Sequence, residues 1–168
     1  MNHFKRILVL GAPGSGKSAL SLELSEKFNL ELIVLDHYYW SKDWSPLPLL
    51  EFRKICAHLA QKEQWVMDGN FGSTLNERLP HADLVIFLTP SPWISCWRQF
   101  LRSLGIGRKI SRPQNCPERF NRDLFWLTYK FNGAHGKLLE SKIKEEYPNT
   151  PLIKIKKGSA LFKHPHFN

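Results

Sequence analysis

Long apolar runs are missing from this sequence of 168 residues. Its apolar stretches, such as Ile7–Leu10 and Val85–Leu88, fall far short of the roughly 20 apolar residues that a membrane-spanning helix requires. Lys5 and Arg6 precede the first stretch, but that stretch stops at Gly11 and no small-residue cleavage pattern follows. We therefore expect neither a secretory signal nor a membrane as a partner.

Cysteine is also scarce. The sequence has only Cys56, Cys96 and Cys116, which form no Cys-x-x-Cys pair and no Cys/His group with zinc-ligand spacing. This argues against a disulfide framework and against a structural zinc site. We expect reduced thiols in a cytoplasmic protein, with Cys116 as a structural residue.

Acidic residues are few compared with basic ones: 15 against 24, which gives a net charge of +9. The excess is concentrated between residues 95 and 122, where seven basic residues stand against the single acid Glu118. The seven are Arg98, Arg102, Arg108, Lys109, Arg112, Arg119 and Arg122. This balance favours a polyanionic partner such as a nucleotide, a nucleic acid or a phosphorylated substrate. Charge alone leaves open whether this segment faces DNA, a triphosphate or bulk water.

What remains is the composition of an ordinary globular protein, with 42% apolar and 23% charged residues. We expect strands at residues 5–10, 31–35, 65–67, 83–88 and 151–155, and helices at 16–28, 49–62, 93–104, 117–131 and 136–147, with a short helical tail from about residue 159. The alternation predicts an α/β protein with a five-stranded parallel sheet between two helical layers. We expect one domain over residues 1–168, with residues 105–122 as a basic lid segment.

The segment Gly11–Ser18 reads G-A-P-G-S-G-K-S and fits the phosphate-binding pattern G-x-x-x-x-G-K-S between a strand and a helix. In such a loop the glycines let backbone N–H groups surround a phosphate. Lys17 would reach the β- and γ-phosphates and Ser18 would ligate Mg²⁺. The alternative is a glycine-rich turn that only caps a helix. The expected residues of this ATP site are Gly11, Ala12, Pro13, Gly14, Ser15, Gly16, Lys17, Ser18 and Ala19.

A phosphate-binding loop needs a carboxylate near the metal, normally at the end of a neighbouring strand. The fourth strand ends at Thr89 without an acid, whereas Asp36 follows the second strand and Asp68 the third. Because parallel strands end at one edge of a sheet, both acids can reach the cleft. We expect Asp68 to hold Mg²⁺ with Ser18, and Asp36 to orient an acceptor hydroxyl or take its proton. The alternative for each is a turn or cap residue.

Two arginines and an aromatic group complete the candidate site. Arg98 and Arg102 share one side of an expected helix, where they can neutralise phosphate charge during transfer or form a solvated basic stripe. Gly105 and Gly107 then supply hinge freedom or end that helix. Aromatic residues after Asp36 can stack on a substrate or close the core. They are His37, Tyr38, Tyr39, Trp40 and Trp44.

Together these residues resemble the adenylate-kinase-like branch of P-loop kinases. The segment Trp65–Phe71 is similar to the strand-plus-Asp-Gly-Phe segment of nucleoside monophosphate kinases, in which the aspartate helps to hold Mg²⁺ through water. Arg98 and Arg102 match the R-x-x-x-R pair that opens the lid of those enzymes. In such kinases the loop after the last strand contacts adenine, which implies a contact at residues 158–160. Over residues 7–131 the sequence also resembles small bacterial proteins named DNA topology modulation (FlaR-related) proteins.

The resemblance has two departures. Asn70-Phe71-Gly72-Ser73 stands where adenylate kinases carry an acceptor-side arginine, and His37–Trp40 replaces their monophosphate-binding loop. Both departures argue against AMP as the acceptor.

Three functions stay open. The first is a Mg·ATP-dependent kinase of an unidentified small molecule, with a nucleotide or nucleoside among the candidates. The second is a DNA-associated ATP-binding protein that modulates DNA topology, although the sequence has no helix-turn-helix, zinc finger or RNA-binding signature. The third is a nucleotide-binding regulator without catalysis.

Overall fold

The computed structural model describes residues 4–107, 110, 113–117, 122–131 and 136–167. At its centre lies a five-stranded sheet with the strand order β2-β3-β1-β4-β5. The strands are β1 (Arg6–Gly11), β2 (Glu31–Val34), β3 (Trp65–Asp68), β4 (Leu84–Leu88) and β5 (Leu152–Ile155). Every neighbouring pair is parallel, which confirms the predicted sheet.

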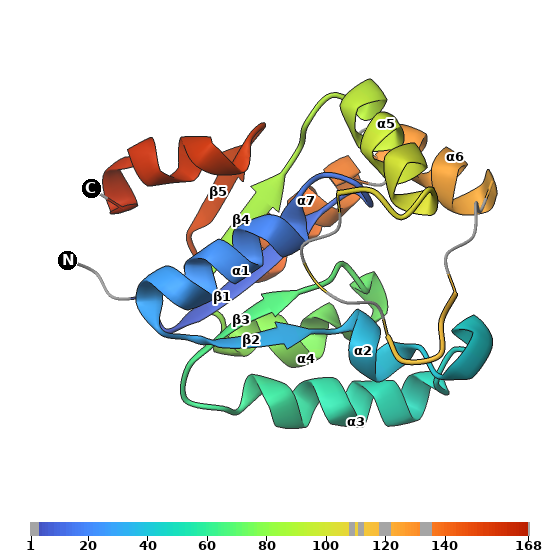
Figure 1. Cartoon of the computed structure of the whole chain (residues 1–168). Helices are drawn as coiled ribbons and strands as arrows, with labels where there is room; N and C mark the ends of the chain where they lie inside the picture. The colour runs from blue at the N-terminus through green and yellow to red at the C-terminus, as the bar shows by residue number, and fades with distance from the viewer. Residues whose placement is uncertain (1–3, 108–109, 111–112, 118–121, 132–135, 168) are drawn as a thin grey trace.

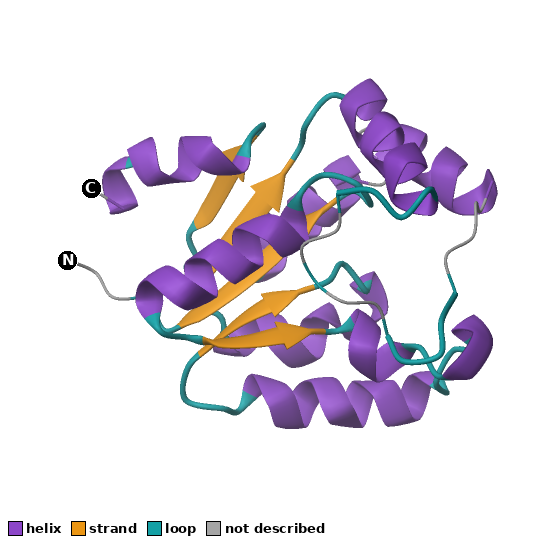
Figure 2. Cartoon of the chain, viewed as in Figure 1, coloured by secondary structure: helices purple, strands orange, loops and turns teal. Residues whose placement is uncertain are grey.

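Helices cover both faces of the sheet (Figures 1 and 2). They are α1 (Lys17–Phe28), α2 (Asp36–Tyr39), α3 (Leu49–Ala60), α4 (Leu75–Arg78), α5 (Pro92–Ser103), α6 (Arg122–Lys130) and α7 (Gly136–Glu146). Short 3₁₀ turns occupy Lys42–Trp44, Gly72–Thr74, Leu79–His81, Gly158–Lys163 and Pro165–Phe167. The arrangement confirms the predicted layers, with α5 and α6 packed together beyond the carboxyl edge of the sheet (Figure 1).

The two faces of the sheet bury separate apolar clusters. In β1, Ile7 and Val9 pack with α1 on one face, whereas Leu8 and Leu10 pack with residues of α3 and α7 on the other. A strand that is covered on both faces needs apolar side chains at consecutive positions. This is why the strands read as short continuous apolar runs in the sequence.

Several predicted boundaries were wrong. Gly16 is the N-cap of α1 rather than a helical residue, and its φ of 99° suits glycine. The second strand, expected over residues 31–35, ends at Val34, and Asp36 is the first residue of α2. The helix expected over residues 117–131 is observed over Arg122–Lys130, and residues 118–121 lie outside the described part of the chain. The 3₁₀ turns after residue 157 form the expected helical tail.

The sequence prediction missed α2, α4 and the 3₁₀ turns beside them. Each of these elements spans three or four residues, too few to show a helical period. Among the residues that the structure describes, no helix combines the length and the apolar character that crossing a membrane requires.

Candidate functional site

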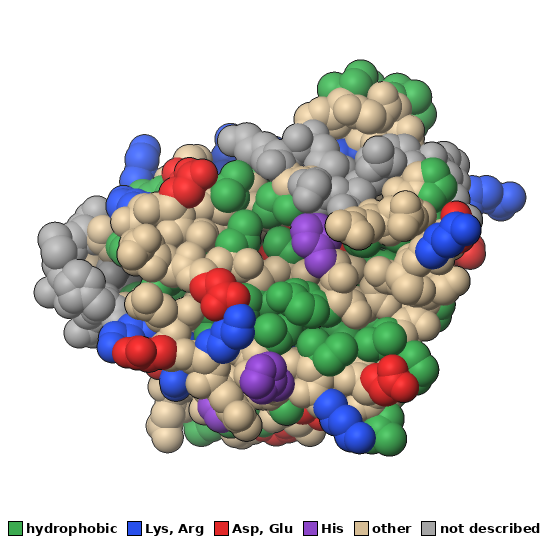
Figure 3. Space-filling view, turned by 60° about the horizontal axis from the view of Figure 1, so that its bottom comes forward, with side chains coloured by type: hydrophobic (Ala, Val, Ile, Leu, Met, Phe, Trp, Pro, Cys, Tyr) green, Lys and Arg blue, Asp and Glu red, His purple; other side chains and the backbone are tan. Residues whose placement is uncertain are grey.

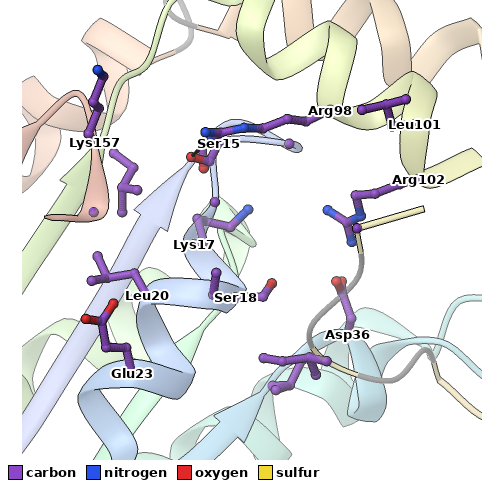
Figure 4. A pocket seen from close by; sticks show the side chains of 18 of the residues that line it. Ser15, Lys17, Ser18, Leu20, Glu23, Asp36, Arg98, Leu101, Arg102 and Lys157 are labelled. Atoms are coloured by element: carbon purple, nitrogen blue, oxygen red, sulfur yellow. Dashed lines mark hydrogen bonds between the residues drawn. The ribbon is translucent and has the colours of Figure 1, made fainter. Parts of the chain in front are cut away.

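A cavity of about 460 Å³ opens at the carboxyl edge of the sheet, where it is lined by the loop before α1, by α2 and by α5 (Figure 4). Every expected residue from Gly14 to Ala19 lines it, whereas Gly11, Ala12 and Pro13 are not among the described residues that do. The other expected residues in its lining are Asp36, His37, Arg98, Arg102, Gly107, Gly158 and Ser159, and Lys157 lines it without having been expected. The structure thus brings most of the predicted site together.

The loop between β1 and α1 is held by its contact with α5. Gly14 has a φ of 72°, and a Cβ atom at this position would lie 2.2 Å from the carbonyl oxygen of Ser95. Arg98 adds a hydrogen bond from its Nη1 to the carbonyl oxygen of Ser15, at 3.1 Å. Only glycine combines this backbone conformation with so close an approach, so α5 and the loop form one wall of the cavity.

Asn70 fixes the other end of the same loop. The N–H of Gly11 donates to Asn70 Oδ1 at 2.8 Å, and Asn70 Nδ2 donates to the carbonyl oxygen of Gly11 at 2.6 Å. This reciprocal pair ties the turn after β3 to Gly11, where β1 meets the glycine-rich loop before α1. The sequence pattern placed Asn70 in the segment after the third strand and gave no indication of this pairing with Gly11.

Arg78 of α4 stabilises the turn that follows β3. Its side chain is fully buried and donates to the carbonyl oxygens of Gly69, Asn70 and Phe71 at 2.8–3.0 Å. Burial lowers the pKa of Arg78 to about 10. Sequence reasoning missed Arg78 as well. No local signal in the sequence marks Arg78, because its partners are backbone carbonyl groups.

Lys17 of the cavity and the buried Asp68 attract one another electrostatically. Lys17 Nζ donates to the carbonyl oxygen of Ala12 at 3.3 Å. Asp68, at the end of β3, is 4% exposed and is not among the described residues that line the cavity. Burial raises the pKa of Asp68, an effect that the Lys17 charge and a hydrogen bond from Ser18 oppose. Burial lowers the pKa of Lys17, against the attraction of Asp68 and Asp36.

The arrangement around Asp68 fits a magnesium ion. Its Oδ1 atom is buried and has no hydrogen-bond partner among the described atoms, and Ser18 supplies a second oxygen nearby. The described residues hold no group of three or more His, Cys, Asp or Glu side chains suited to a metal. Magnesium does not need such a group, because it commonly takes one or two protein oxygens together with phosphate oxygens and water.

Asp36 stands in a different environment from Asp68. It is exposed at the start of α2, lines the cavity, and lies across it from Arg102 of α5 (Figure 4). Arg98 lies on the same side of α5, above the loop. A carboxylate and two guanidinium groups therefore approach the space next to the Lys17 side chain from opposite walls.

Most of the aromatic residues after Asp36 belong to the core and its rim. The Tyr39 ring lies 4.8 Å from the rings of Phe52 and Phe71, and Trp40 packs against Trp44 with ring centres 5.8 Å apart. Of this group, only His37 is among the described residues that line the cavity. The expectation that these rings close the core is thus confirmed for Tyr39.

The basic segment is described only in part. Arg108, Arg112 and Arg119 lie outside the described residues, and Arg122 is exposed at the start of α6. Its centre contacts the region after α2. Trp44 Nε1 donates to the carbonyl oxygen of Pro117 at 2.9 Å, and Cys116 Sγ donates to that of Ser41 at 3.1 Å. Cys116 is buried, as expected of a structural cysteine.

No family model matches the chain. The uncharacterized protein YqaC of Bacillus subtilis is 33% identical over 86 residues, which make up 50% of this chain and 48% of that protein. The match thus spans about half the length of this curated relative and names no activity.

Solved structures match much more of the chain. A "putative kinase" from Chloroflexus aurantiacus is similar over 95% of both chains, with a TM-score of 0.55 and 20% identity. The chain has a P-loop NTPase fold. Shikimate kinase from Bacteroides thetaiotaomicron matches 90% of this chain and 86% of its own, with a TM-score of 0.49 and 17% identity. At such identities the likeness establishes the fold alone, and neither structure supports the resemblance to DNA topology modulation proteins.

Proposed function

We propose that this protein is a Mg·ATP-dependent kinase that phosphorylates a hydroxyl group of a small molecule. The observation that carries the proposal is the cavity itself. Its lining combines a phosphate-binding loop, two arginines and an exposed carboxylate, and a buried carboxylate with a free oxygen lies beneath it. A switch protein that only binds nucleotide has no need of Asp36 on the wall opposite Arg102.

The phosphates of ATP fit against residues 14–19, where the loop N–H groups and the Lys17 ammonium face the cavity. Ser18 and Asp68 would hold Mg²⁺, which supplies neutralising charge to the phosphate oxygens when it is bound. The backbone at Gly158 and Ser159, on the α1 side of the cavity, is our candidate contact for adenine.

Transfer to the acceptor needs positioning more than covalent chemistry. The acceptor oxygen forms a bond to the γ-phosphorus while the bond from that phosphorus to the ADP oxygen breaks, and ADP leaves with the bonding electrons. Asp36 takes the proton of the acceptor hydroxyl. Arg98 and Arg102 hold the phosphoryl oxygens, for which a guanidinium fork is well shaped. Residues 105–122 would close over the cavity and exclude water.

The decisive experiment incubates the protein with γ-labelled ATP, Mg²⁺ and a panel of nucleosides, nucleotides, sugars and other hydroxyl compounds. We expect label on one acceptor class. Lys17→Ala should lower transfer by about 10²–10³-fold and weaken ATP binding. Asp36→Asn should lower transfer by about 10²-fold and change ATP affinity much less, because the proposal places Asp36 against the acceptor. No heat on titration of Mg·ATP would contradict the proposal. So would ATP hydrolysis that only duplex DNA stimulates, which would favour the DNA-associated alternative.

A further inference from the structure

The outer side of α5 carries a row of large apolar side chains. Trp93, Trp97, Phe100 and Leu104 are 71%, 61%, 41% and 60% exposed. They follow one another at intervals of four, three and four residues, so they lie along one side of the helix. This is the spacing of the narrow apolar seam by which one helix packs against another.

Helix α6 widens this row into a continuous surface. The Trp93 and Tyr129 rings lie 5.6 Å apart, and the Tyr129 and Trp126 rings 6.0 Å apart. Trp126 and Tyr129 are themselves 55% and 40% exposed. We call the four residues of the α5 row, together with Trp126 and Tyr129, the aromatic face.

The size of the aromatic face is that of a protein interface. An aromatic side chain offers roughly 150–250 Å² of surface, so five that are 40–71% exposed present on the order of 500 Å². Leu104, 60% exposed, adds to this area, and each partner of a stable pair buries roughly 800 Å². A monomer rarely leaves so large an apolar patch in water.

The distribution of charge favours a second copy of this chain as the partner, despite the net charge of +9. The α5 row of the aromatic face is uncharged, and the charged group recorded against the face is on α6, where Lys130 Nζ lies 5.6 Å from the centre of the Trp126 ring. The arginines of α5 turn the other way, since Arg98 Nη1 bonds to the carbonyl oxygen of Ser15 and Arg102 lines the cavity. By contrast, charged side chains of both signs are scattered over the side of the molecule that carries α3 (Figure 3). Two α5 helices can therefore meet without like charges in the seam.

We propose that the aromatic face joins two copies of this chain in a symmetric dimer, with α5 of one copy packed against α5 of the other. A two-fold pairing uses the same surface on both copies, as one uninterrupted apolar seam allows. Because the opposite side of α5 forms a wall of the cavity, the dimer would brace Arg98 and Arg102 from behind. The dimer itself does not depend on the proposed kinase activity.

Sedimentation velocity of the full chain over a range of micromolar concentrations tests the proposal. We expect a species of twice the chain mass for the unaltered protein. Leu104→Glu should raise the dimer dissociation constant about tenfold or more, because it places a charge in an apolar interface. Leu50→Glu is the matched control, since Leu50 is a leucine of α3 that is 67% exposed and lies outside the aromatic face. It should leave the dissociation constant unchanged.

A second variant and a second partner class make the outcome unambiguous. Trp97→Glu should act as Leu104→Glu does, and circular dichroism should show that each variant keeps its fold. A chain that sediments as a monomer at every concentration overturns the proposal, as does an equal effect of Leu50→Glu and Leu104→Glu. A monomer that co-sediments with vesicles of anionic phospholipid, and loses this in Trp97→Glu, also overturns it and makes the face a lipid contact.

Discussion

The cavity and the outer edge of the sheet at β5 differ in whether their polar groups have hydrogen-bond partners. In the cavity region, the Oδ1 atom of Asp68 and the hydroxyl groups of Ser15 and Ser95 are buried without a hydrogen-bond partner in the described structure. At the outer edge, Glu140 of α7 accepts hydrogen bonds from Lys154 Nζ at 2.6 Å and from Lys144 Nζ at 2.9 Å.

The difference separates groups that stabilise the fold from groups that await a ligand. A buried polar atom without a partner costs about 1–3 kcal/mol, so a protein keeps one where it serves another purpose. The pKa of Asp68 is raised by burial, whereas the pKa of Glu140 is lowered by the hydrogen bonds from its two lysines. We infer that the cavity gives up stability for binding and that the outer edge does not.

The largest expected effect follows replacement of Lys17, one of the cations that line the cavity. Lys17→Ala should lower the rate of phosphoryl transfer by about 10²–10³-fold, the cost of removing a donor that faces developing charge. The fold should survive, because Lys17 is only partly buried. Transfer assays beside a thermal unfolding curve measure both quantities. A Lys17→Ala protein with unchanged transfer activity would contradict the inference that the polar groups of the cavity serve binding.

Asp68→Asn should lower transfer by about 10²-fold and yet stabilise the ligand-free protein at neutral pH. Because the pKa of Asp68 is raised in the folded state, its contribution to stability is present below the unfolded pKa and is lost as pH rises through the folded pKa. Asparagine does not ionise, so the gain should appear at neutral pH and disappear in acid. Urea unfolding at the two pH values measures it.

The matched control for Asp68→Asn is Asp36→Asn. Asp36 is exposed, so its replacement should change the free energy of unfolding little at either pH. An equal gain in both variants would show that the stabilisation does not come from the burial of Asp68.

Gly14 and Gly105 have similar φ angles but different surroundings. Their alanine variants therefore distinguish the cost of backbone strain from the cost of a steric clash. Gly14→Ala should destabilise the fold by about 2–4 kcal/mol, because φ is 72° and the added Cβ would lie 2.2 Å from a backbone oxygen. Gly105→Ala, with φ of 77° and no heavy atom within 4 Å of the added Cβ, should cost only about 1 kcal/mol. Urea denaturation of both variants gives the difference, and equal values would mean that α5 does not confine the loop.

The smallest effect is expected at the outer edge. Because the pKa of Glu140 is lowered, its stabilisation is present above the unfolded pKa and is lost as pH falls through the folded pKa. Glu140→Gln should therefore cost about 1 kcal/mol at neutral pH and nothing in strong acid. Glu146→Gln should cost almost nothing at any pH, since Glu146 is exposed and 3.9 Å from Lys142 Nζ. Unfolding free energies over a pH series compare the two.

Local patterns in the sequence were sufficient to predict the sheet and the place of the glycine-rich loop between β1 and α1. Each strand is covered on both faces and reads as an apolar run, and the loop needs its glycines, Lys17 and Ser18 in consecutive order. The position of Asp68 at the end of a buried strand was predictable for the same reason, and its role with magnesium stays a prediction. These features depend on residues that are neighbours in the chain.

The contacts that hold the site together were not predictable in this way. Asn70 and Gly11 are 59 residues apart, and the sequence near either residue does not predict their pairing. Arg78 finds its partners in backbone carbonyl groups, which are the same in every sequence. The row Trp93, Trp97, Phe100 and Leu104 has the spacing of a core-facing stripe, yet it points outward, because the opposite side of α5 is needed at the cavity.

The central position of β1 in the sheet has a consequence for unfolding. Its backbone is hydrogen-bonded to β3 on one side and to β4 on the other, whereas β2 and β5 each have a single neighbour. Edge strands open in local fluctuations, but the hydrogen bonds of a central strand open only when the whole protein unfolds. The amide protons of Ile7–Leu10 should thus be the slowest to exchange with heavy water, and the loop that follows them stays anchored until the last cooperative event.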